Sequence, residues 1–377
     1  MTDAFADLAA FDLDPANGFL PGEDPLPRLP DAFAVWDRVG ADLPALLVTS
    51  RARAAIETMP VLDPAGLSGR REEERGLLLL VYLASAFVWG GAEPARRVPA
   101  SIGRPLILLS ERMGRVPIIH YGSTLHNWRR VDPAAPVVFD NLDTPVRFLG
   151  GADECWFFQI ELGVELEGRD AIPAMIAAKR AAAAGDAEAL VPLLGRIAAA
   201  TERMTAMLER TAEWCAPWAF YHRVRPWVAS WPAPGLVYEG ADDTGPRPYA
   251  GGSAAQSALV QAIDVTLGIV HDGHDTSRFL TDMRRYMTPG HRRFLSALGE
   301  GASVRDLCAR AGGAVRDAYD ATVDTIDGLR KAHTGIAVRY IINMARDEKA
   351  VGTGGTELAS FLKATRTETK AARLAGA

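Results

Sequence analysis

The chain has 377 residues, 48% of them hydrophobic and 23% charged, which is typical of a globular protein large enough for two domains. Its formal net charge of −6 argues against nucleic acid as the main partner, because phosphate binding needs a basic surface. Cys155, Cys215 and Cys308 are widely spaced and form no C-x-x-C pair, which argues against a disulfide framework or a thiolate zinc site.

The N-terminus and the apolar runs argue against membrane association. The opening residues MTDAFADLAAFDLD are acidic where a secretory signal peptide would be basic. The longest apolar run, from Gly76 to Ala86, is too short to span a bilayer. Together with the cysteine pattern, these features predict a cytoplasmic protein.

The first part of the chain, residues 1–148, predicts a small and mostly helical domain. Five prolines within the first 32 residues predict an irregular segment. Residues 93–150 contain short segments interrupted by prolines, with room for one short hairpin, and Pro145 to Asp153 is expected to join two domains. The expected helices of this part are residues 31–40, 43–58 and 67–90.

Residues 149–377 predict a larger, all-helical domain, so that the fold class expected for the whole chain is all-α. Alanine-rich stretches favour helix, Gly185 separates two of them, and Pro289 ends another helix. No internal repeat is visible. The expected helices are residues 154–166, 171–184, 187–215, a helix starting near 254, and residues 275–287, 290–299, 303–311, 313–345 and 356–373.

Leu329 to Met344 is the stretch with the clearest chemical pattern. His333 lies in the middle of an apolar helical face, and Arg330 precedes it by three residues. An imidazole of this kind can ligate haem iron, and a guanidinium one turn away can pair with a haem propionate. A lone histidine on an apolar face is more often an ordinary core residue, so this helix alone leaves both interpretations open. The apolar residues of the face are Val323, Ile326, Leu329, Ile336, Ala337, Tyr340, Ile341 and Met344.

Residues 271–275, with the sequence HDGHD, could suggest a metal site because they hold two imidazoles and two carboxylates. Metal sites usually take a further ligand from a distant rigid element, however, and Gly273 favours a turn here. A polar surface loop is therefore the expected interpretation.

Two glycine-rich stretches resemble catalytic motifs only in part. Gly251 to Ala255 lacks the final glycine of a nucleophile elbow and instead predicts a helix N-terminus that offers N–H groups to an anion. Gly352 to Thr356 lacks the lysine of a phosphate-binding loop and is better explained as a loop that closes over a substrate.

Several motifs in a fixed order bear a strong resemblance to one family. The chain contains YEG, GGSAAQS, RRYMTPGHRRFL, the Arg330-x-x-His333 pair, GTGGT and LKATR. In this order they resemble the indoleamine 2,3-dioxygenase family, haem enzymes of tryptophan breakdown. The resemblance extends from Gly18 to Arg366 and is densest after Tyr238.

The resemblance implies a haem b enzyme that uses O2 to convert L-tryptophan into N-formylkynurenine, the opening of the kynurenine pathway of tryptophan catabolism. It also implies a small N-terminal domain that covers the distal pocket, an electron donor that keeps the iron ferrous, and a monomer rather than an oligomer. Two alternatives remain open. The protein could act on another indole or aromatic amine, or it could be a non-enzymatic protein that binds haem or O2.

The resemblance also implies roles for individual residues. His333 matches the iron ligand, and Asp264 matches the carboxylate that pairs with Arg330 and orients a haem propionate. Ser253 and Ala254 match positions beside the haem. The matched substrate residues are Arg225 for the carboxylate, Phe220, Phe157 and Tyr121 for the indole pocket, and Thr353 for the closing loop.

One position departs from the family. Glu161 lies where the family usually has a small serine, or in some members a histidine. A carboxylate here could hydrogen-bond the substrate N–H, hold a water on ferric iron, or turn outward. Burying it charged without a partner would cost several kcal/mol, so a partner or a proton is expected.

Overall fold

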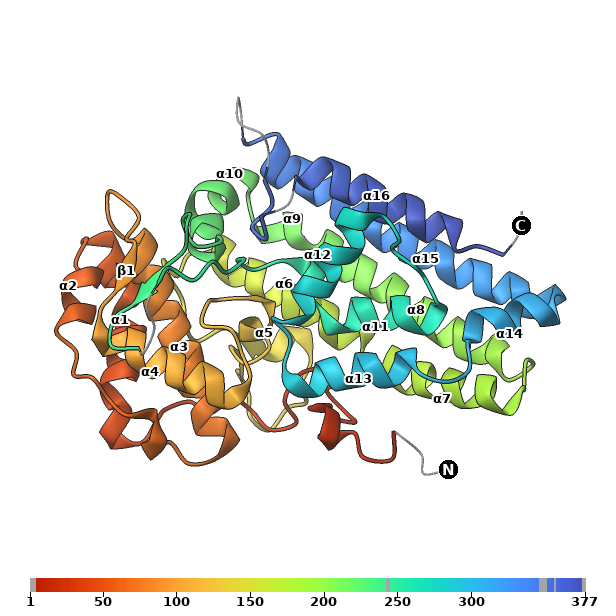
Figure 1. Ribbon diagram of the computed structural model, residues 1–377, viewed down its shortest axis with the longest axis horizontal. Helices are drawn as coiled ribbons and strands as arrows, with labels where there is room; N and C mark the ends of the chain where they lie inside the picture. Colours follow the sequence, from red (N-terminus) through yellow and green to blue (C-terminus); the bar gives the residue numbers. More distant parts are fainter. Residues whose placement is uncertain (1–4, 242–244, 346–350, 356, 375–377) are drawn as a thin grey trace.

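The computed structural model describes residues 5–241, 245–345, 351–355 and 357–374. Figure 1 shows α1–α4 gathered at one end of the molecule, while the longer helices from α6 onward form the larger body. The four strands in the described residues have only two residues each, so the predicted all-α class is confirmed. The principal helices are α1 (Ala34–Val48), α2 (Ala52–Glu57), α3 (Gly69–Trp89), α4 (Ala100–Met113), α5 (Tyr121–Thr124), α6 (Ala152–Gly168), α7 (Ala171–Ala184), α8 (Leu190–Glu209), α9 (Thr211–Trp214), α10 (Pro217–Ala219), α11 (Ala258–Leu267), α12 (His274–Arg284), α13 (Pro289–Gly299), α14 (Val304–Ala311), α15 (Gly313–Ala337) and α16 (Leu358–Ala371).

Helix α3 forms the centre of the smaller end. Its charged first turns lead into an apolar half in which every residue from Leu77 to Val88 is buried. It packs against α1 and α4. The predicted helix 67–90 is confirmed, but the predicted break before residue 43 is wrong. Helix α1 continues through Pro44, and the chain turns instead at Ser50, whose φ is +57°.

Helix α4 is the main element that the sequence did not predict, because Pro99 and Pro105 suggested short irregular segments. Pro99 precedes the helix and Pro105 lies within it. The possible hairpin is present as an antiparallel pair of strands, β2 (Arg129–Arg130) and β3 (Leu142–Asp143). A second pair, β1 (Arg97–Val98) and β4 (Val237–Tyr238), is parallel and connects the chain after a short 3-10 helix, η6 (Arg225–Val228), to the smaller end.

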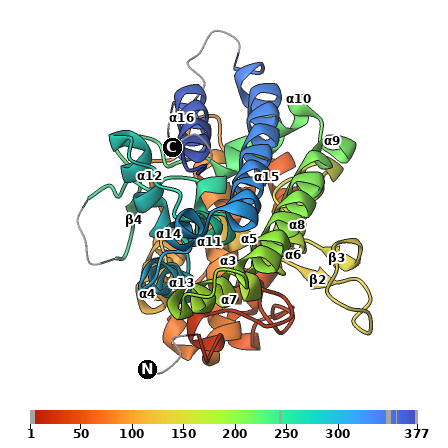
Figure 2. The same ribbon diagram turned by 90° about the vertical axis from the view of Figure 1, so that its right-hand side faces the viewer.

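Helix α8 is the centre of the larger body, where it packs against α6, α7 and α15. Figure 2 shows these helices side by side from one end of the molecule. The predicted helix 171–184 is confirmed, and Gly185 ends it in the left-handed conformation with φ +71°. Residues 313–345 form α15 followed by a π-helical turn, η8 (Val338–Ile342), without a break at Gly328 or Gly335.

Two large hydrophobic clusters fill the molecule. One consists mainly of residues 29–148 but also contains Phe158, Trp227 and Met283. The other joins the second half of the chain to the N-terminal segment and to Tyr121 and Trp128. Side chains from both halves thus enter both clusters, and the domain boundary at residue 148 stays a prediction.

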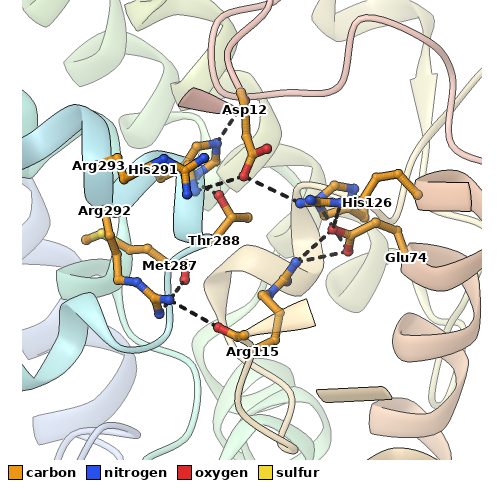
Figure 3. Close-up of polar contacts among 12 residues, drawn as sticks. Asp12, Glu74, Arg115, His126, Met287, Thr288, His291, Arg292 and Arg293 are labelled. Carbon is orange, nitrogen blue, oxygen red and sulfur yellow. Dashed lines mark hydrogen bonds and ion pairs between the residues drawn. The ribbon is translucent and has the colours of Figure 1, made fainter. Parts of the chain in front are cut away.

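A buried polar cluster connects the N-terminal segment with α3 and α13 (Figure 3). The carboxylate of Asp12 accepts a hydrogen bond from the Gly290 amide at 3.0 Å, and the Asp12 carbonyl lies 3.1 Å from Nε2 of His291. On the α3 side, the Arg115 guanidinium donates to both oxygens of Glu74 at 2.9 and 3.1 Å, while His126 lies 3.6 Å from Glu74. These contacts hold together segments that are far apart in the sequence.

None of the helices in the described part of the chain is both long enough and apolar enough to cross a lipid bilayer.

Candidate functional site

A cavity of about 270 Å³ lies between the long helices of the larger body and the loops that face the smaller end. Two π-helical turns, η5 (Phe220–Val224) and η8, contribute to its wall through Phe220, Tyr340 and Ile341. Such turns interrupt the regular helical pattern and are frequent at functional sites. The other walls come from α5, α6, α11, α12, α15, α16 and the loops around residues 252–255 and 352–354.

His333 projects from α15 into this cavity. No residue in the described ranges forms a hydrogen bond with its imidazole. Burial, together with the nearby Arg330, lowers the pKa of His333 below its ordinary value. The ring is therefore neutral at physiological pH and has a nitrogen lone pair available, as an axial haem ligand requires.

Arg330, one turn before His333, forms the predicted pair with Asp264 of α11. Its Nη2 donates to Oδ2 of Asp264 at 2.6 Å, and its Nη1 donates to Oγ1 of Thr369 at 2.8 Å. Burial alone would raise the pKa of Asp264, but Arg330 and His271 outweigh that effect and keep it below its ordinary value. The other oxygen of Asp264, Oδ1, is buried without a hydrogen-bond partner in the described structure.

His271 belongs to the same polar group and is not at the surface. Its Nδ1 lies 2.7 Å from Glu368 and its Nε2 lies 3.4 Å from Asp264, with the side chain only 8% exposed. Burial lowers the pKa of His271, but Asp264 and Glu368 raise it by more than burial lowers it, so its pKa lies above the ordinary value. The predicted surface loop is thus wrong for His271, because its imidazole bridges α11 and α16. The described residues contain no cluster of three or more His, Cys, Asp or Glu side chains that could hold a metal ion. The side chain of His274 is not part of the described structure.

The two glycine-rich loops contact one another at the cavity. The hydroxyl of Thr353 donates to the carbonyl of Gly252, and Ser230 donates from its hydroxyl to the Thr353 carbonyl at 2.7 Å. A Cβ on Gly354 would lie 3.3 Å from the Cβ of Ser253, so a side chain here would crowd the contact. Ser253 and Ala254, which were expected beside the haem, and Thr353, which was expected on the closing loop, all line the cavity. Thr356 lies outside the described residues.

Aromatic rings form one wall. The rings of Phe157 and Phe220 are 4.8 Å apart, and Phe220 also meets the edge of Tyr340 at 5.9 Å. Tyr121 lines the cavity from α5, and its hydroxyl donates to Glu165 at 2.9 Å. The structure therefore brings the three predicted aromatic residues, Phe157, Phe220 and Tyr121, to one cavity, and Tyr340 is an addition that the sequence did not single out.

Arg225 is the one predicted residue that does not line the cavity in this conformation. Its Nη2 donates to the carbonyl of Val351 at 2.6 Å, and its guanidinium lies 5.1 Å from the centre of the Tyr221 ring. The hydrogen bond ties the arginine to the chain just before the 352–355 loop. Arg225 is therefore coupled to that loop instead of pointing at the cavity.

Glu161 lies on α6 and lines the cavity. Its Oε2 accepts a hydrogen bond from the Thr124 hydroxyl at 2.7 Å. One turn further on, Oε1 of Glu165 accepts from Tyr121 and from Ser257, the latter at 2.7 Å, while Oε2 is buried without a partner in the described structure. Burial raises the pKa of Glu161 to about 8 and that of Glu165 to about 7. Of the expected alternatives for Glu161, outward rotation is thus excluded in this conformation.

The comparisons with known proteins agree with this site. A family model described as indoleamine 2,3-dioxygenase matches residues 7–372. The chain is 34% identical to indoleamine 2,3-dioxygenase 1 of Rattus norvegicus, with 97% of this chain and 96% of the rat protein aligned. The chain belongs to the indoleamine 2,3-dioxygenase family. It is also 34% identical to indoleamine 2,3-dioxygenase 1 of Mus musculus (93% and 92% aligned) and 32% identical to indoleamine 2,3-dioxygenase 2 of Homo sapiens (96% and 94% aligned).

Membership of the indoleamine 2,3-dioxygenase family confirms the expected class. The protein is a haem-dependent dioxygenase, an oxidoreductase that uses O2, as the indoleamine 2,3-dioxygenase names of its family and relatives indicate. The residues present fit the cofactor, because the imidazole of His333, which makes no hydrogen bond within the described chain, lines the same cavity as Arg330, one turn before it, and the Arg330 partner Asp264 of α11.

Sequence reasoning missed several polar residues of this dioxygenase site. His271, Glu368 and Thr369 complete the surroundings of Asp264 and Arg330, and they come from separate elements with no shared motif. Thr124 had no distinguishing sequence signal, and Ser257, the last residue of the GGSAAQS motif, was given no role from the sequence. The spacing of Glu161 and Glu165, four residues apart on one helix, was the only available indication of the paired acids.

Proposed function

We propose that this protein catalyses the insertion of both atoms of O2 across the C2–C3 bond of the indole ring of L-tryptophan, giving N-formylkynurenine. The observation that carries this proposal is the neutral imidazole of His333, which faces a cavity with aromatic walls and makes no hydrogen bond within the described chain. A histidine that served only to fill the core would instead be packed against hydrocarbon or paired with a polar group.

Haem b would be held by the imidazole of His333, with the Arg330–Asp264 pair fixing the turn of α15 that holds this histidine. Ser253 and Ala254, at the start of a short helical turn (η7, Ala254–Gln256), border the cavity where backbone N–H groups can meet a carboxylate. The bound haem supplies the oxygen chemistry, while the protein supplies orientation and a cavity from which water is largely excluded.

The indole ring of the substrate would lie against Phe157 and Phe220, whose rings offer an apolar surface, with Tyr121 on a further wall. The carboxylate would be bound by Arg225 and the amino-acid backbone by Thr353. Arg225 now donates to the Val351 carbonyl, and exchange of this carbonyl for a substrate carboxylate gives a stronger, charge-assisted contact. Substrate binding would then also release the 352–355 loop from the arginine.

The mechanism needs no strong general base. The charged groups of the cavity wall, Arg330 and Asp264, are paired with one another, and burial raises the pKa of the two acids beside the aromatic residues, Glu161 and Glu165. The contribution of the chain is therefore orientation of two reactants in a dry site.

The test is an absorption spectrum of the purified protein with and without tryptophan, followed by product analysis under O2. A Soret band that shifts on addition of tryptophan, together with N-formylkynurenine, is expected. Haem without a tryptophan-induced shift would favour the carrier alternative, which the family names do not support. A shift with a different product would indicate another indole substrate.

We further propose that a separate electron donor keeps the iron ferrous, that the protein is a cytoplasmic monomer, and that it acts in tryptophan catabolism through the kynurenine pathway. Size-exclusion chromatography with light scattering measures the oligomeric state directly.

A further inference from the structure

Glu161 lines the cavity and has one carboxyl oxygen with no hydrogen-bond partner in the described chain. Its Oε2 is occupied by the Thr124 hydroxyl at 2.7 Å. Its Oε1 has no such contact, and it is not sealed within the protein in the way that Oε2 of Glu165 is. The family reaction, as proposed above, assigns no chemistry to this oxygen.

The contact with Thr124 determines where a proton on Glu161 resides. Because Thr124 donates to Oε2, that oxygen acts as an acceptor. A neutral Glu161 therefore carries its proton on Oε1 and offers the cavity an O–H donor. An ionised Glu161 offers the cavity only an acceptor.

The surroundings favour the neutral form at physiological pH. The titratable groups that act on Glu161 are Glu165 from the same helix, Tyr121 from α5 and Tyr82 from α3, and none of them is a cation. Burial, the largest influence, raises the pKa of Glu161 to about 8, and the Thr124 hydrogen bond offsets this only in part. A lone buried carboxylate would lack the partner that its charge requires.

We propose that Glu161 donates a hydrogen bond from Oε1 to an oxygen acceptor inside the cavity and so determines which ligands the cavity prefers. This inference rests on the proposed function, since it takes haem and an indole substrate as the occupants. The acceptor belongs either to a diatomic ligand of the haem or to the carboxylate of the substrate. Ionisation of Glu161 turns the donor into a repelling acceptor, so the preference is lost in alkaline solution.

The first experiment uses the ferrous holoprotein with carbon monoxide as the probe, because a nearby hydrogen-bond donor lowers the CO stretching frequency. The variants are Glu161→Gln, which keeps a donor that does not titrate, and Glu161→Leu, which removes it. Glu167→Gln, a half-exposed carboxylate on the same helix paired with Arg203, is the matched control. At pH 6 the wild type, the control and the Gln variant should show a lower CO stretch than the Leu variant. At pH 10 the wild-type band should move up to the Leu position, while the Gln band stays in place.

The second experiment measures the affinity for tryptophan and for tryptamine, which lacks the carboxylate. If the acceptor is the substrate carboxylate, Glu161→Leu should weaken tryptophan binding about 10-fold while tryptamine binding is unchanged, and Glu161→Gln should restore it. This result supports the inference even where the CO stretch is the same in all variants.

Thr124→Val provides a test that keeps Glu161 in place should the Leu variant fail to fold. Removing the Thr124 hydroxyl removes the hydrogen bond that lowers the pKa of Glu161, so the midpoint of the wild-type CO transition should move to higher pH. Holoprotein whose CO stretch and tryptophan affinity are the same in wild type, Glu161→Leu and Thr124→Val at both pH values overturns this inference alone. A chain that binds no haem overturns the proposed function, and the inference with it.

Discussion

The Nη2 atom of Arg330 lies 2.6 Å from Oδ2 of Asp264, and this contact joins α15 to α11 one turn before His333. The same carboxylate oxygen lies 3.4 Å from Nε2 of His271, whose other nitrogen meets Glu368 on α16. Helices α11, α15 and α16 are therefore linked through Asp264, Arg330 and His271. The position of the His333 imidazole depends on this junction. This arrangement orients a haem ligand through groups that do not touch the iron.

Replacing this carboxylate should weaken both the fold and haem binding. Asp264→Asn keeps the shape but leaves the buried Arg330 guanidinium without the carboxylate that balances its charge, while His271 keeps only Glu368. We expect a loss of about 3 kcal/mol in the free energy of unfolding, measured by urea denaturation of the apoprotein, and weaker haem retention in a transfer assay to apomyoglobin. Asp324→Asn, which breaks the exposed pair with Arg373, is the control and should cost less than about 1 kcal/mol. Equal losses of unfolding free energy in Asp264→Asn and Asp324→Asn would contradict the role of Asp264 in joining the helices.

Replacing the imidazole itself should abolish haem retention without unfolding the chain. His333→Ala removes the ligand from a cavity wall where the imidazole makes no hydrogen bond within the described structure, so little folding energy depends on it. We expect no Soret band after purification and a melting temperature of the apoprotein close to that of the wild type. His222→Ala, at an exposed position, should retain full haem content. A His333→Ala protein with normal haem content would show that another residue is the ligand.

Arg225→Ala should raise the KM for tryptophan while haem content is unchanged. One charge-assisted hydrogen bond contributes roughly 1.5–3 kcal/mol, which corresponds to a KM increase of about 10- to 100-fold. The neighbouring exposed residue provides the control, since Arg223→Ala should leave the KM within a factor of two. Unchanged kinetics in Arg225→Ala would mean that this side chain only holds Val351, as it does in the present conformation.

The stability that the two buried histidines in Figure 3 contribute should be lost in mild acid. Burial lowers the pKa of both His126 and His291 to about 4, from 6.5 in the unfolded chain. Between these values the unfolded state binds more protons, so stability is lost as pH falls from about 6.5 to about 4. Burial would raise the pKa of Glu74, but Arg115 and the other cations around it lower it to about 2, so its contribution is lost only below about pH 4.5.

Urea denaturation at pH 7.5 and pH 5 measures this acid sensitivity. Each histidine should contribute about 2 kcal/mol less at pH 5 than at pH 7.5, on the scale of about 1.4 kcal/mol per pKa unit, while Glu161 and Glu165, whose pKa values are raised, act in the opposite direction. The comparison is therefore between the wild type and His126→Asn, whose difference in free energy of unfolding should shift by about 2 kcal/mol against the wild type from pH 7.5 to pH 5. His222→Asn, which is exposed, should leave the slope unchanged. A difference between the wild type and His126→Asn that is the same at pH 7.5 and pH 5 would show that His126 is not neutral in the folded state.

Local pattern determined much of the helical framework from the sequence. The charged start and apolar half of α3, the alanine-rich run of α7 with Gly185 after it, and the apolar face around His333 all show their structure in a window of a few turns. Helix α4 was missed because Pro99 and Pro105 are local signals for irregular structure, and tertiary packing of its apolar face outweighs them. The same packing carries α1 through Pro44.

By itself, the sequence determined the family and the helical class, because these depend on residue type and order along the chain; the pairing of Arg330 with Asp264 was expected only from the family resemblance. Only the tertiary structure decided that His271 is buried beside Asp264, that Arg225 rests on the Val351 carbonyl, and that Thr124 occupies one oxygen of Glu161. Each of these contacts joins segments between seven and 126 residues apart. Hydrogen-bond geometry and burial across such separations follow from how the helices pack, which no local sequence pattern encodes.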